Sequence, residues 1–389
     1  MSIHHNELCV NSEIYQKPFP HFGRPRIIGY IDIENLKYAQ NIRNCEVSFD
    51  LNEQINNVIR KPADLDVKLT ELLKFLLDHQ HRLKLQASNK IESATIFCYR
   101  GLMTCVACTP YENRDPWKIV AILFKGNIYL CARDTEEKKM QKKNMTVRDL
   151  MFSSWGYKFE QYVVSDSPQT DPTPEMPVNE MEEFSLVLKT NINRHNIVFG
   201  AEMDGIRCDK ECVQEKPDLV LGPEALIQYL SSKEFIEIKT SRHIETSNQD
   251  RNFRRFKAKK WWCQSFLVGI DTILCGFRND DGIVERLKTY RVADLPKMSK
   301  KFWDPNVCFN FLDTFFTYVK RCLYKEIKLK FGEMGLNNLH SVPLTGLLFE
   351  WKPGCNVRVN RNYRHEDDQI IPDVFINNYG KYDNCWDDI

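Results

Sequence analysis

The chain has 389 residues and a formal net charge of +1 at pH 7. A charge this close to zero excludes a global electrostatic field that would attract nucleic acid, so any such attraction must be local. Its 23 Phe, 15 Tyr and 7 Trp can fill a sizeable core, in one large domain or two smaller ones. No apolar run is long enough to span a bilayer, and residues 1–7 lack the basic and apolar segments of a secretory signal. We therefore expect no membrane partner.

The first third of the chain is expected to form strands around one helix. Residues 1–25 are polar and contain three prolines, which predicts an extended arm ahead of a single domain over residues 26–389. Apolar residues at helical spacing predict a helix over residues 64–79. Apolar, β-branched and aromatic runs predict strands over residues 27–33, 95–99, 102–108, 117–124 and 128–131, with a tight turn at 125–127.

The rest of the chain alternates between the two kinds of element. Residues 134–146 are charged and indicate a flexible segment, and residues 166–177 indicate a surface loop. Helices are expected over residues 147–162, 224–230, 248–267 and 307–328. Strands are expected over residues 184–188, 197–204, 234–240, 272–277 and 346–352. The alternation contains no internal repeat and predicts an α/β (mixed α+β) domain with a central sheet flanked by helices.

Fourteen cysteines raise the question of a zinc site. Cys105 and Cys108, with Cys208 and Cys212, have spacings that could supply two halves of one. However, the first pair lies in an apolar run that is expected to be a strand, and the other cysteines are scattered. Without a secretory signal, reduced and buried thiols are the simpler interpretation.

Two short segments place acidic residues at strand spacing. Glu202 and Asp204 are two positions apart, and alternate side chains of a strand point to the same face. Glu237 and Lys239 share a face in the same way, while the isoleucines on either side of Glu237 are expected to look into apolar surroundings. If these two strands are neighbours, three carboxylates and one ammonium meet on a small patch.

Such a patch suggests a metal site. Carboxylates crowded at low dielectric repel each other unless a cation lies among them, and hard oxygen ligands suit Mg²⁺ or Mn²⁺. Lys239, two residues after an acid, would be placed to hold a phosphate or an attacking water. Metal-dependent nucleases work in this way. The alternative interpretation is a pair of ordinary half-exposed strands with solvated acids.

A fourth acid, Glu160, lies in the predicted helix 147–162, whose apolar side is expected to include Met151, Phe152 and Tyr162. A lone glutamate there would ordinarily face solvent. Beside the other acids it would be an extra ligand, direct or through water, for a second metal ion. Two-metal sites stabilise both the attacking and the leaving oxygen of a phosphoryl displacement.

The predicted helix 248–267 is strongly basic, with six Lys or Arg among residues 251–260. The side chains expected to pack inward at helical spacing are Phe253, Phe256, Cys263 and Leu267. A neighbouring stripe is expected to consist of Lys257, Lys260 or Trp261, and Gln264. Such an edge could hold phosphates, and its aromatic rings could stack on bases. The alternative, which composition favours, is a solvated basic face with the tryptophans as core anchors.

Three further features are less specific. Arg100 follows a predicted strand, and its guanidinium could fork onto a phosphate or pair with a surface acid. His243 could touch nucleic acid, although a structural or solvated role is simpler. Residues 365–368 are expected to form a solvated acidic loop.

Taken in order, these motifs resemble those of the DXO/Dom3Z family of eukaryotic decapping exonucleases and its fungal relatives. The similarity runs from about Arg100 to Trp351, which is most of the chain. The matching segments are residues 98–101, 155–160, 200–204, 235–241 and 260–267, and residues 347–354 resemble a late strand of the family. All the acids of the family's motifs are present as carboxylates.

The resemblance implies a restriction-nuclease-like core of the PD-(D/E)xK type and two divalent ions, Mg²⁺ or Mn²⁺. By position it makes metal ligands of the acids and one main-chain carbonyl, namely Glu160, Glu202, Asp204, Glu237 and Ile238. It also implies that Lys239 and Gln264 orient the attacking water and the scissile phosphate, and that Arg100 holds the 5′ portion of the substrate.

The activity implied is hydrolysis of incompletely capped, 5′-triphosphate or NAD-capped RNA ends, with 5′–3′ exoribonuclease activity in many members. A nuclear location, with the cytoplasm as a second one, and a 5′–3′ exoribonuclease partner are further expectations. Two other functions stay open at this point: a catalytically silent protein that binds RNA ends or serves as a scaffold, and a DNA nuclease with the same core.

Overall fold

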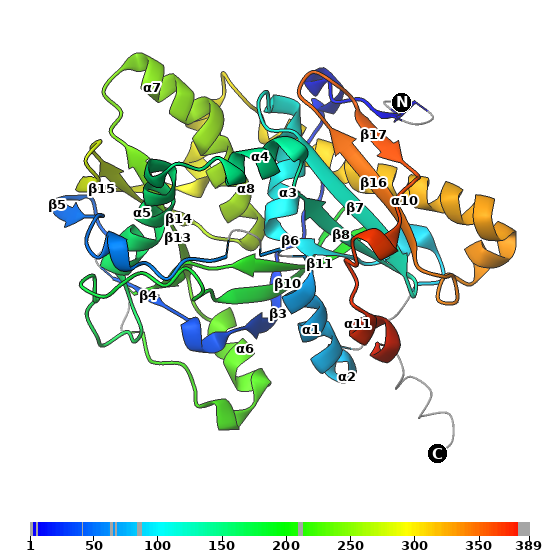
Figure 1. Ribbon diagram of the computed structural model, residues 1–389, viewed down its shortest axis with the longest axis horizontal. Helices are drawn as coiled ribbons and strands as arrows, with labels where there is room; N and C mark the ends of the chain where they lie inside the picture. Colours follow the sequence, from blue (N-terminus) through cyan, green and yellow to red (C-terminus); the bar gives the residue numbers. More distant parts are fainter. Residues whose placement is uncertain are drawn as a thin grey trace.

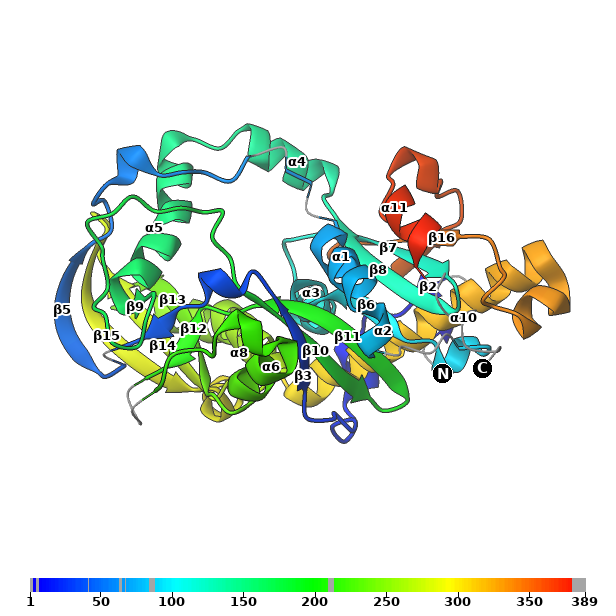
Figure 2. The ribbon, with the colours of Figure 1, turned by 90° about the horizontal axis from the view of Figure 1, so that it is seen from below.

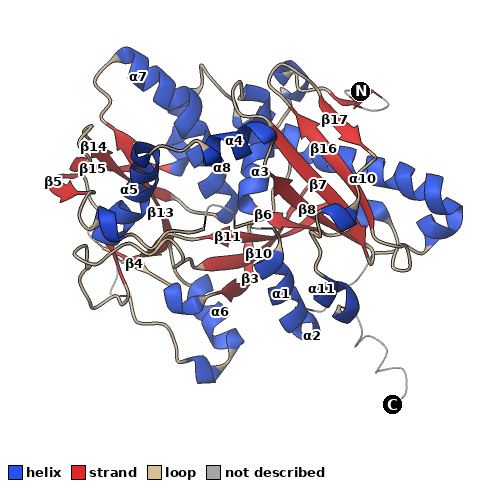
Figure 3. Ribbon diagram, in the orientation of Figure 1, coloured by secondary structure: helices blue, strands red, loops and turns tan. Residues whose placement is uncertain are grey.

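A computed structural model describes the backbone of residues 3–4, 7–40, 42–62, 65–66, 68–83, 88–208 and 213–379. Within these residues the chain forms two β-sheets that lie side by side, with helices around them (Figure 1; Figure 3). The larger sheet contains, in spatial order, β1 (Ile3–His4), β2 (Glu7–Leu8), β17 (Val357–Asn360), β16 (Thr345–Trp351), β7 (Trp117–Phe124), β8 (Asn127–Arg133), β6 (Ile96–Tyr99), β11 (His195–Glu202), β10 (Ser185–Ile192) and β3 (Arg26–Ile31). The smaller sheet contains β5 (Cys45–Asp50), β15 (Ile283–Arg291), β14 (Thr272–Arg278), β13 (Phe235–Arg242), β12 (Gly205–Arg207), β4 (Tyr38–Ala39) and β9 (Val164–Ser165).

The helices cover both faces of these sheets. They are α1 (Thr70–Asp78), α2 (Gln80–Leu83), α3 (Arg100–Cys108), α4 (Glu136–Lys143), α5 (Val147–Val163), α6 (Pro223–Ser231), α7 (Ser247–Asn252), α8 (Ala258–Val268), α9 (Leu295–Ser299), α10 (Pro305–Asn337) and α11 (Asp373–Asn378). Figure 2 shows α1 and α11 on the opposite side of the larger sheet from α10. Parallel and antiparallel pairing both occur, since β6 runs parallel to β8 and β11 while β7 runs antiparallel to β8. The mixed α/β fold predicted from the sequence is therefore confirmed.

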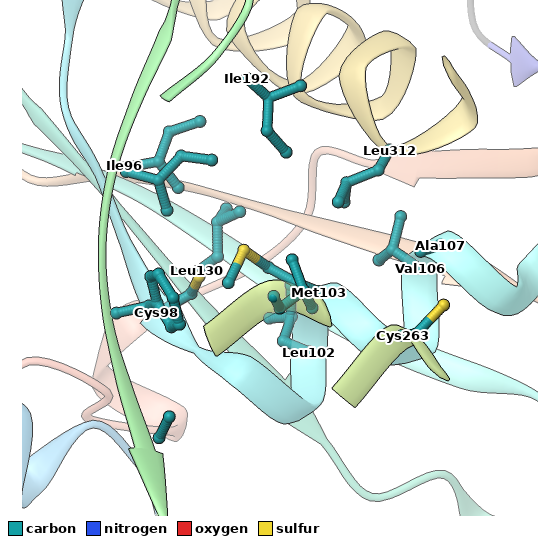
Figure 4. Packing of buried hydrophobic residues seen from close by; sticks show 14 of the residues in the cluster. Ile96, Cys98, Leu102, Met103, Val106, Ala107, Leu130, Ile192, Cys263 and Leu312 are labelled. Carbon is teal, nitrogen blue, oxygen red and sulfur yellow. The ribbon is translucent and has the colours of Figure 1, made fainter. Parts of the chain in front are cut away.

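Alternate residues of the central strands of the larger sheet pack into the hydrophobic cores on its two opposite faces, as the two-residue period of a strand requires. On one face, Phe97 and Val198 pack with Leu72 and Leu76 of α1. On the other face, strand and helix residues form the main core with α3 and α10. Figure 4 shows this core from close by, with Met103 of α3 among the strand residues and the residues of α10.

The hairpin predicted at residues 125–127 is confirmed. Strands β7 and β8 pair antiparallel up to Phe124 and Asn127. Lys125 and Gly126 both have positive φ, 44° and 74°, which is the conformation of a two-residue turn that matches the twist of its strands.

The run 102–108 is a helix and not the strand that its apolar composition suggested. It belongs to α3, where Leu102, Met103, Val106 and Ala107 are buried and Cys105 is exposed. The two exposed positions of this segment, Gly101 and Cys105, are four residues apart, which is the period of a helix, but a short apolar run alone does not distinguish the two structures. The Sγ atom of Cys108 lies 3.7 Å from that of Cys263 in α8, while Cys212 lies outside the described residues.

The helix predicted over residues 64–79 is shorter than expected, because α1 begins at Thr70. Before it, the carboxylate of Asp66 pairs with both terminal guanidinium nitrogens of Arg133, and this ion pair ties the segment to β8. Residues 63, 64 and 67 lie outside the described residues. Conversely, the segment predicted to be flexible over residues 134–146 contains α4, whose first turn is capped by the side chain of Thr135.

Two long helices also differ from their predicted form. The helix expected over residues 248–267 is interrupted by a π-helical segment at Phe253–Lys257 between α7 and α8. Such a segment shifts the helical register, so positions before and after it do not share one straight stripe. The helix expected over residues 307–328 extends through α10, with non-helical backbone at Gly332.

Candidate functional site

The acidic residues meet where the chain passes from one sheet to the other. Strand β11 of the larger sheet ends at Glu202, and β12 of the smaller sheet begins at Gly205. Gly205 pairs with Ile236 in antiparallel register, and continuing that register by one residue sets Asp204 opposite Glu237. The two acidic segments of the sequence are therefore neighbours, as predicted.

The side chains of β13 separate as expected from strand spacing. Ile236 and Ile238 pack into the core that contains α5. Glu237 and Lys239 pair in parallel register with Ile273 and Cys275, which belong to the core on the opposite side. The alternation thus buries the isoleucines and directs the carboxylate and the ammonium away from them.

Glu237 lies at the centre of a buried ionic network. Its Oε2 accepts a hydrogen bond of 3.0 Å from Arg100 Nη1, and its Oε1 lies 2.6 Å from Lys239 Nζ. The same ammonium is 3.6 Å from Asp204 Oδ2, which also accepts the backbone N–H of Ile238 at 2.5 Å. Glu237 is 1% exposed, so its charge is held by these cations and not by water.

Arg100 reaches this network because of strand pairing. Strand β6 ends at Tyr99, which pairs in parallel register with Gly200 of β11, and Arg100 begins α3 directly afterwards. A Cβ atom on Gly200 would lie 2.6 Å from the Tyr99 ring, so only glycine permits this close approach. Arg100 is buried and bound to Glu237, in contrast to a surface ion pair.

Glu160 is placed by the packing of α5. Trp155, Phe159 and Val163 form the buried face of this helix at spacings of four residues, whereas Phe152, predicted to lie on the apolar side, is exposed. The Phe159 ring would lie 2.6 Å from a Cβ atom on Gly276 of β14, so glycine lets the helix approach the sheet closely. Glu160, the next residue, lines the same cavity as Glu202 and Asp204.

That cavity has a volume of about 500 Å³. Besides the predicted acids, its walls include Lys37, Tyr157 and Glu183, none of which was singled out from the sequence. Lys37 forms ion pairs with Asp166 at 2.5 Å and with Glu182 at 3.3 Å. The acidic pair 182–183 directly before a predicted strand was the one sequence feature that could have indicated this wall.

The acids facing the cavity resist ionisation. Burial raises the pKa of Glu160 well above its ordinary value, and the charge of Asp204 raises it further. Burial also raises the pKa of Asp204, against the opposing effect of Lys239. Water in the cavity reaches Glu202, yet enclosure by the protein, with repulsion from Glu183 and Asp204, raises its pKa to about 7.

Glu237 behaves differently from these acids. Burial would raise its pKa, but Lys239 and Arg100 outweigh burial and hold the pKa below its ordinary value. This carboxylate is therefore ionised at neutral pH, and its charge is already compensated within the protein.

The residues fit a divalent cation, although they do not enclose one as they stand. Across the described ranges, no three acidic, histidine or cysteine side chains are arranged to hold a metal ion. The positive charges of Arg100 and Lys239 compensate Glu237 instead. Its Oε1 is buried, and no hydrogen bond of suitable angle reaches it from Lys239. Carboxylate oxygens with raised pKa values and one oxygen without a hydrogen bond form a donor set that suits Mg²⁺ or Mn²⁺ once the side chains adjust.

The structure does not bring every predicted residue into this network. Gln264 is half-buried on α8, and among the described residues it makes no side-chain hydrogen bond. Trp261 and Trp262 are buried in the core, so they are anchors and not stacking surfaces for bases. His243 pairs with Glu285, its Nε2 lying 2.8 Å from Oε2.

The raised pKa of Glu202 predicts a pH-dependent stability that metal should reverse. Between its ordinary value of 4.5 and about 7, this carboxyl is ionised in the unfolded chain but protonated in the folded protein. Its contribution to stability is therefore present below pH 4.5 and is lost as the pH rises through about 7. In EDTA, the thermal midpoint of the wild type should fall from pH 5.5 to pH 8 more steeply than that of a Glu202→Gln variant.

If Glu202 is a metal ligand, Mg²⁺ should raise the midpoint more at pH 8 than at pH 5.5, because only the ionised carboxyl would bind the ion. Equal pH slopes for the wild type and Glu202→Gln, measured by thermal unfolding, would contradict this explanation.

Comparison with known proteins places this geometry in a family. A family model described as "RAI1 like PD-(D/E)XK nuclease" matches residues 26–375. The decapping and exoribonuclease protein Rai1 of Drosophila melanogaster is 33% identical over 329 residues, which cover 80% of this chain and 83% of that protein. The decapping and exoribonuclease protein of Xenopus laevis is 29% identical over 389 residues, covering 94% of this chain and 88% of that protein.

Solved structures share the fold at lower identity. Candida albicans Rai1, in complex with pU5 and Mn²⁺, superposes with a TM-score of 0.71 at 18% identity, covering 96% of this chain and 98% of that one. Scheffersomyces stipitis Rai1, in complex with (3′-NADP)⁺ and calcium ion, has a TM-score of 0.70 at 20% identity, covering 94% and 95%. Nucleases of the PD-(D/E)XK type use divalent metals, in agreement with the donor set described above. The chain belongs to the RAI1-like PD-(D/E)XK nuclease family.

Proposed function

We propose that this nuclease is a metal-dependent hydrolase that acts on RNA 5′ ends that are incompletely capped, carry a triphosphate or carry an NAD cap. Two divalent ions, Mg²⁺ or Mn²⁺, would be held by four carboxylates and one main-chain carbonyl, those of Glu160, Glu202, Asp204, Glu237 and Ile238. The supporting observation is the register that sets Asp204 opposite Glu237, beside a cavity lined by Glu160 and Glu202.

The substrate class is supported by the relatives. Their names describe decapping and exoribonuclease proteins, and the related fungal structures contain pU5 or an NADP-derived ligand. A cavity of about 500 Å³ beside the acids can accept the end of a nucleotide chain. We extend the same substrates to this chain because the family match covers residues 26–375.

Bound divalent ions would lower the pKa of a water molecule and neutralise charge that builds up on the phosphate. The protein's own cations would complete the site. Lys239, 3.6 Å from Asp204, would hold a phosphate oxygen or the attacking water. Burial lowers the pKa of Lys239, but Asp204 and Glu237 outweigh burial and raise it, so it stays charged. Arg100 fixes Glu237 and would hold the 5′ portion of the substrate, with Gln264 orienting the scissile phosphate.

A double variant tests this assignment. Glu202→Ala with Asp204→Ala should abolish product formation while leaving the fold largely intact, because both side chains line the cavity and not the hydrophobic core. The measurement uses purified protein, Mg²⁺ or Mn²⁺, and RNAs with a 5′ triphosphate, an unmethylated cap or an NAD cap, with products resolved by mass. Hydrolysis at the normal rate by the folded double variant would refute the site.

The same experiment separates the other two functions left open by the sequence. A wild-type protein that binds these RNAs but forms no product with either metal would be a catalytically silent binding protein. Preference for a DNA substrate of the same sequence would identify a DNA nuclease. The nuclear location and a 5′–3′ exoribonuclease partner stay predictions. On the described chain, no helix is long and apolar enough to cross a membrane.

A further inference from the structure

A second, basic cavity lies at the opposite end of β11 from the acids. It has a volume of about 200 Å³. Its walls come from the start of β11, from the short helix at Ile91–Ser93 and from the middle of α10, and the residues are Ile91, Glu92, Arg194, His195, Thr317, Lys320, Arg321 and Tyr324. Figure 2 shows α10 passing beneath the larger sheet, whose strand β11 begins at His195.

Three cations line this cavity, namely Lys320, Arg194 and Arg321, and among the described residues none of them forms an ion pair. Lys320 is 4% exposed, and its ammonium donates a hydrogen bond of 2.7 Å to the carbonyl of Glu92. An ammonium has three donors, so two are left. Burying a cation without an ion-pair partner is costly, so Lys320 favours an anion beside it, whereas Arg194 is exposed and Arg321 is half-buried.

Two carboxylates act on these cations through their charge, the exposed Glu92 on Lys320 and Asp313 on Arg194, but within the described ranges neither forms an ion pair with them. His195 is 1% exposed, with Nε2 3.1 Å from Thr317 Oγ1 and 3.7 Å from Asp313 Oδ1, and its buried Nδ1 has no hydrogen-bond partner in the described part of the chain. Burial and the charge of Lys320 lower the pKa of His195 to about 3, so the ring is neutral. Burial, together with the nearby charge of Arg194, lowers the pKa of Lys320 to about 8, against the opposing effect of the exposed Glu92.

We propose that this cavity is a binding site for a phosphate group, held by Lys320, Arg194 and Arg321. Guanidinium groups and ammonium groups are the side chains that bind phosphate oxygens, and a tetrahedral oxyanion fits a cavity of about 200 Å³. The phosphate group can belong to a small molecule, such as inorganic phosphate or pyrophosphate, or to the backbone of an RNA.

The site is separate from the acidic one. His195 and Glu202 are the two ends of β11, seven residues apart, which corresponds to roughly 23 Å along the strand. Binding at the basic cavity therefore requires neither the carboxylates nor a metal ion, and the proposed hydrolysis can fail without affecting it.

Isothermal titration in EDTA tests the proposal with three probes: inorganic phosphate, pyrophosphate, and a short RNA with a 5′ hydroxyl. We expect the wild type to bind at least one of them saturably. Arg194→Gln and Lys320→Met should each weaken that binding about ten-fold or more, since each removes a charged hydrogen-bond donor. The exposed Arg194 is the safer variant, because its removal leaves the core intact.

Lys328→Met is the matched control, since Lys328 lies on the same helix, is exposed and pairs with Glu333. It removes the same charge and should leave the affinity unchanged. The double variant Glu202→Ala with Asp204→Ala should also bind the probe with wild-type affinity. Loss of affinity for the two small ions identifies a small-molecule site, and loss confined to the RNA identifies a backbone contact. Unchanged affinity of Arg194→Gln and Lys320→Met for all three probes, or no saturable binding by the wild type, would overturn the proposal.

Discussion

Asp204→Asn is expected to lower the rate of RNA 5′-end hydrolysis at least about 100-fold while raising the thermal midpoint of the metal-free protein. The loss of rate follows if Asp204 is a metal ligand, because a neutral amide is a poor ligand for Mg²⁺ or Mn²⁺. The gain in stability follows from the raised pKa of Asp204, since burial makes its ionised form unfavourable in the folded protein. Asparagine keeps an oxygen that can accept the N–H of Ile238.

Asp171→Asn is the matched control for this variant. Asp171 lines the same cavity and is exposed, so the substitution removes the same charge without touching the ionic network. It should leave the midpoint in EDTA close to that of the wild type, and it should lower the rate far less than Asp204→Asn does. Glu160→Gln should behave like Asp204→Asn, because burial and Asp204 raise the pKa of Glu160 as well. An Asp204→Asn protein that is active, or less stable than the wild type in EDTA, would remove the basis for the assignment.

The alternation of side chains along strands allowed the acidic site to be predicted from the sequence. The spacing of Glu202 and Asp204, and of Glu237 and Lys239, assigned each side chain to a face, and the buried isoleucines of β13 agree. What spacing does not contain is the register between strands. Asp204 meets Glu237 because the chain changes sheets between Glu202 and Gly205, and that crossing depends on contacts far apart in the sequence.

The features that were missed depend on such long-range contacts or on ambiguous local patterns. Lys37 and Glu183 reach the cavity from two loops whose positions are set by the fold. The run 102–108 is apolar enough for either a strand or a helix. In the folded protein it forms a helix that packs in the main core with residues of α10. The π-helical segment before α8 has no simple sequence pattern, so the inward face predicted from Phe253 to Leu267 assumed one regular helix.

Glu237→Gln is expected to destabilise the protein, in contrast to Asp204→Asn, although both remove one negative charge from the same network. Glu237 is the counter-charge of Arg100, 8% exposed, and of Lys239. Removing one partner of a buried ion pair costs about 3 to 5 kcal/mol, because it leaves the other charge uncompensated. The lowered pKa of Glu237 gives the same sign, since the folded protein prefers its ionised form.

A double-mutant cycle separates this pairing from other effects of the substitution. Arg100→Met alone should also destabilise, whereas Glu237→Gln combined with Arg100→Met should cost less than the sum of the two single changes. Unfolding midpoints in EDTA measure the stability, so that metal binding does not contribute. Because Glu237 is ionised over the neutral range, the loss in Glu237→Gln should be present at pH 7 and should shrink only as the pH falls through the lowered pKa of this carboxyl. Equal stability of Glu237→Gln and Asp204→Asn would mean that Arg100 and Lys239 do not depend on Glu237, and that the two acids are electrostatically equivalent.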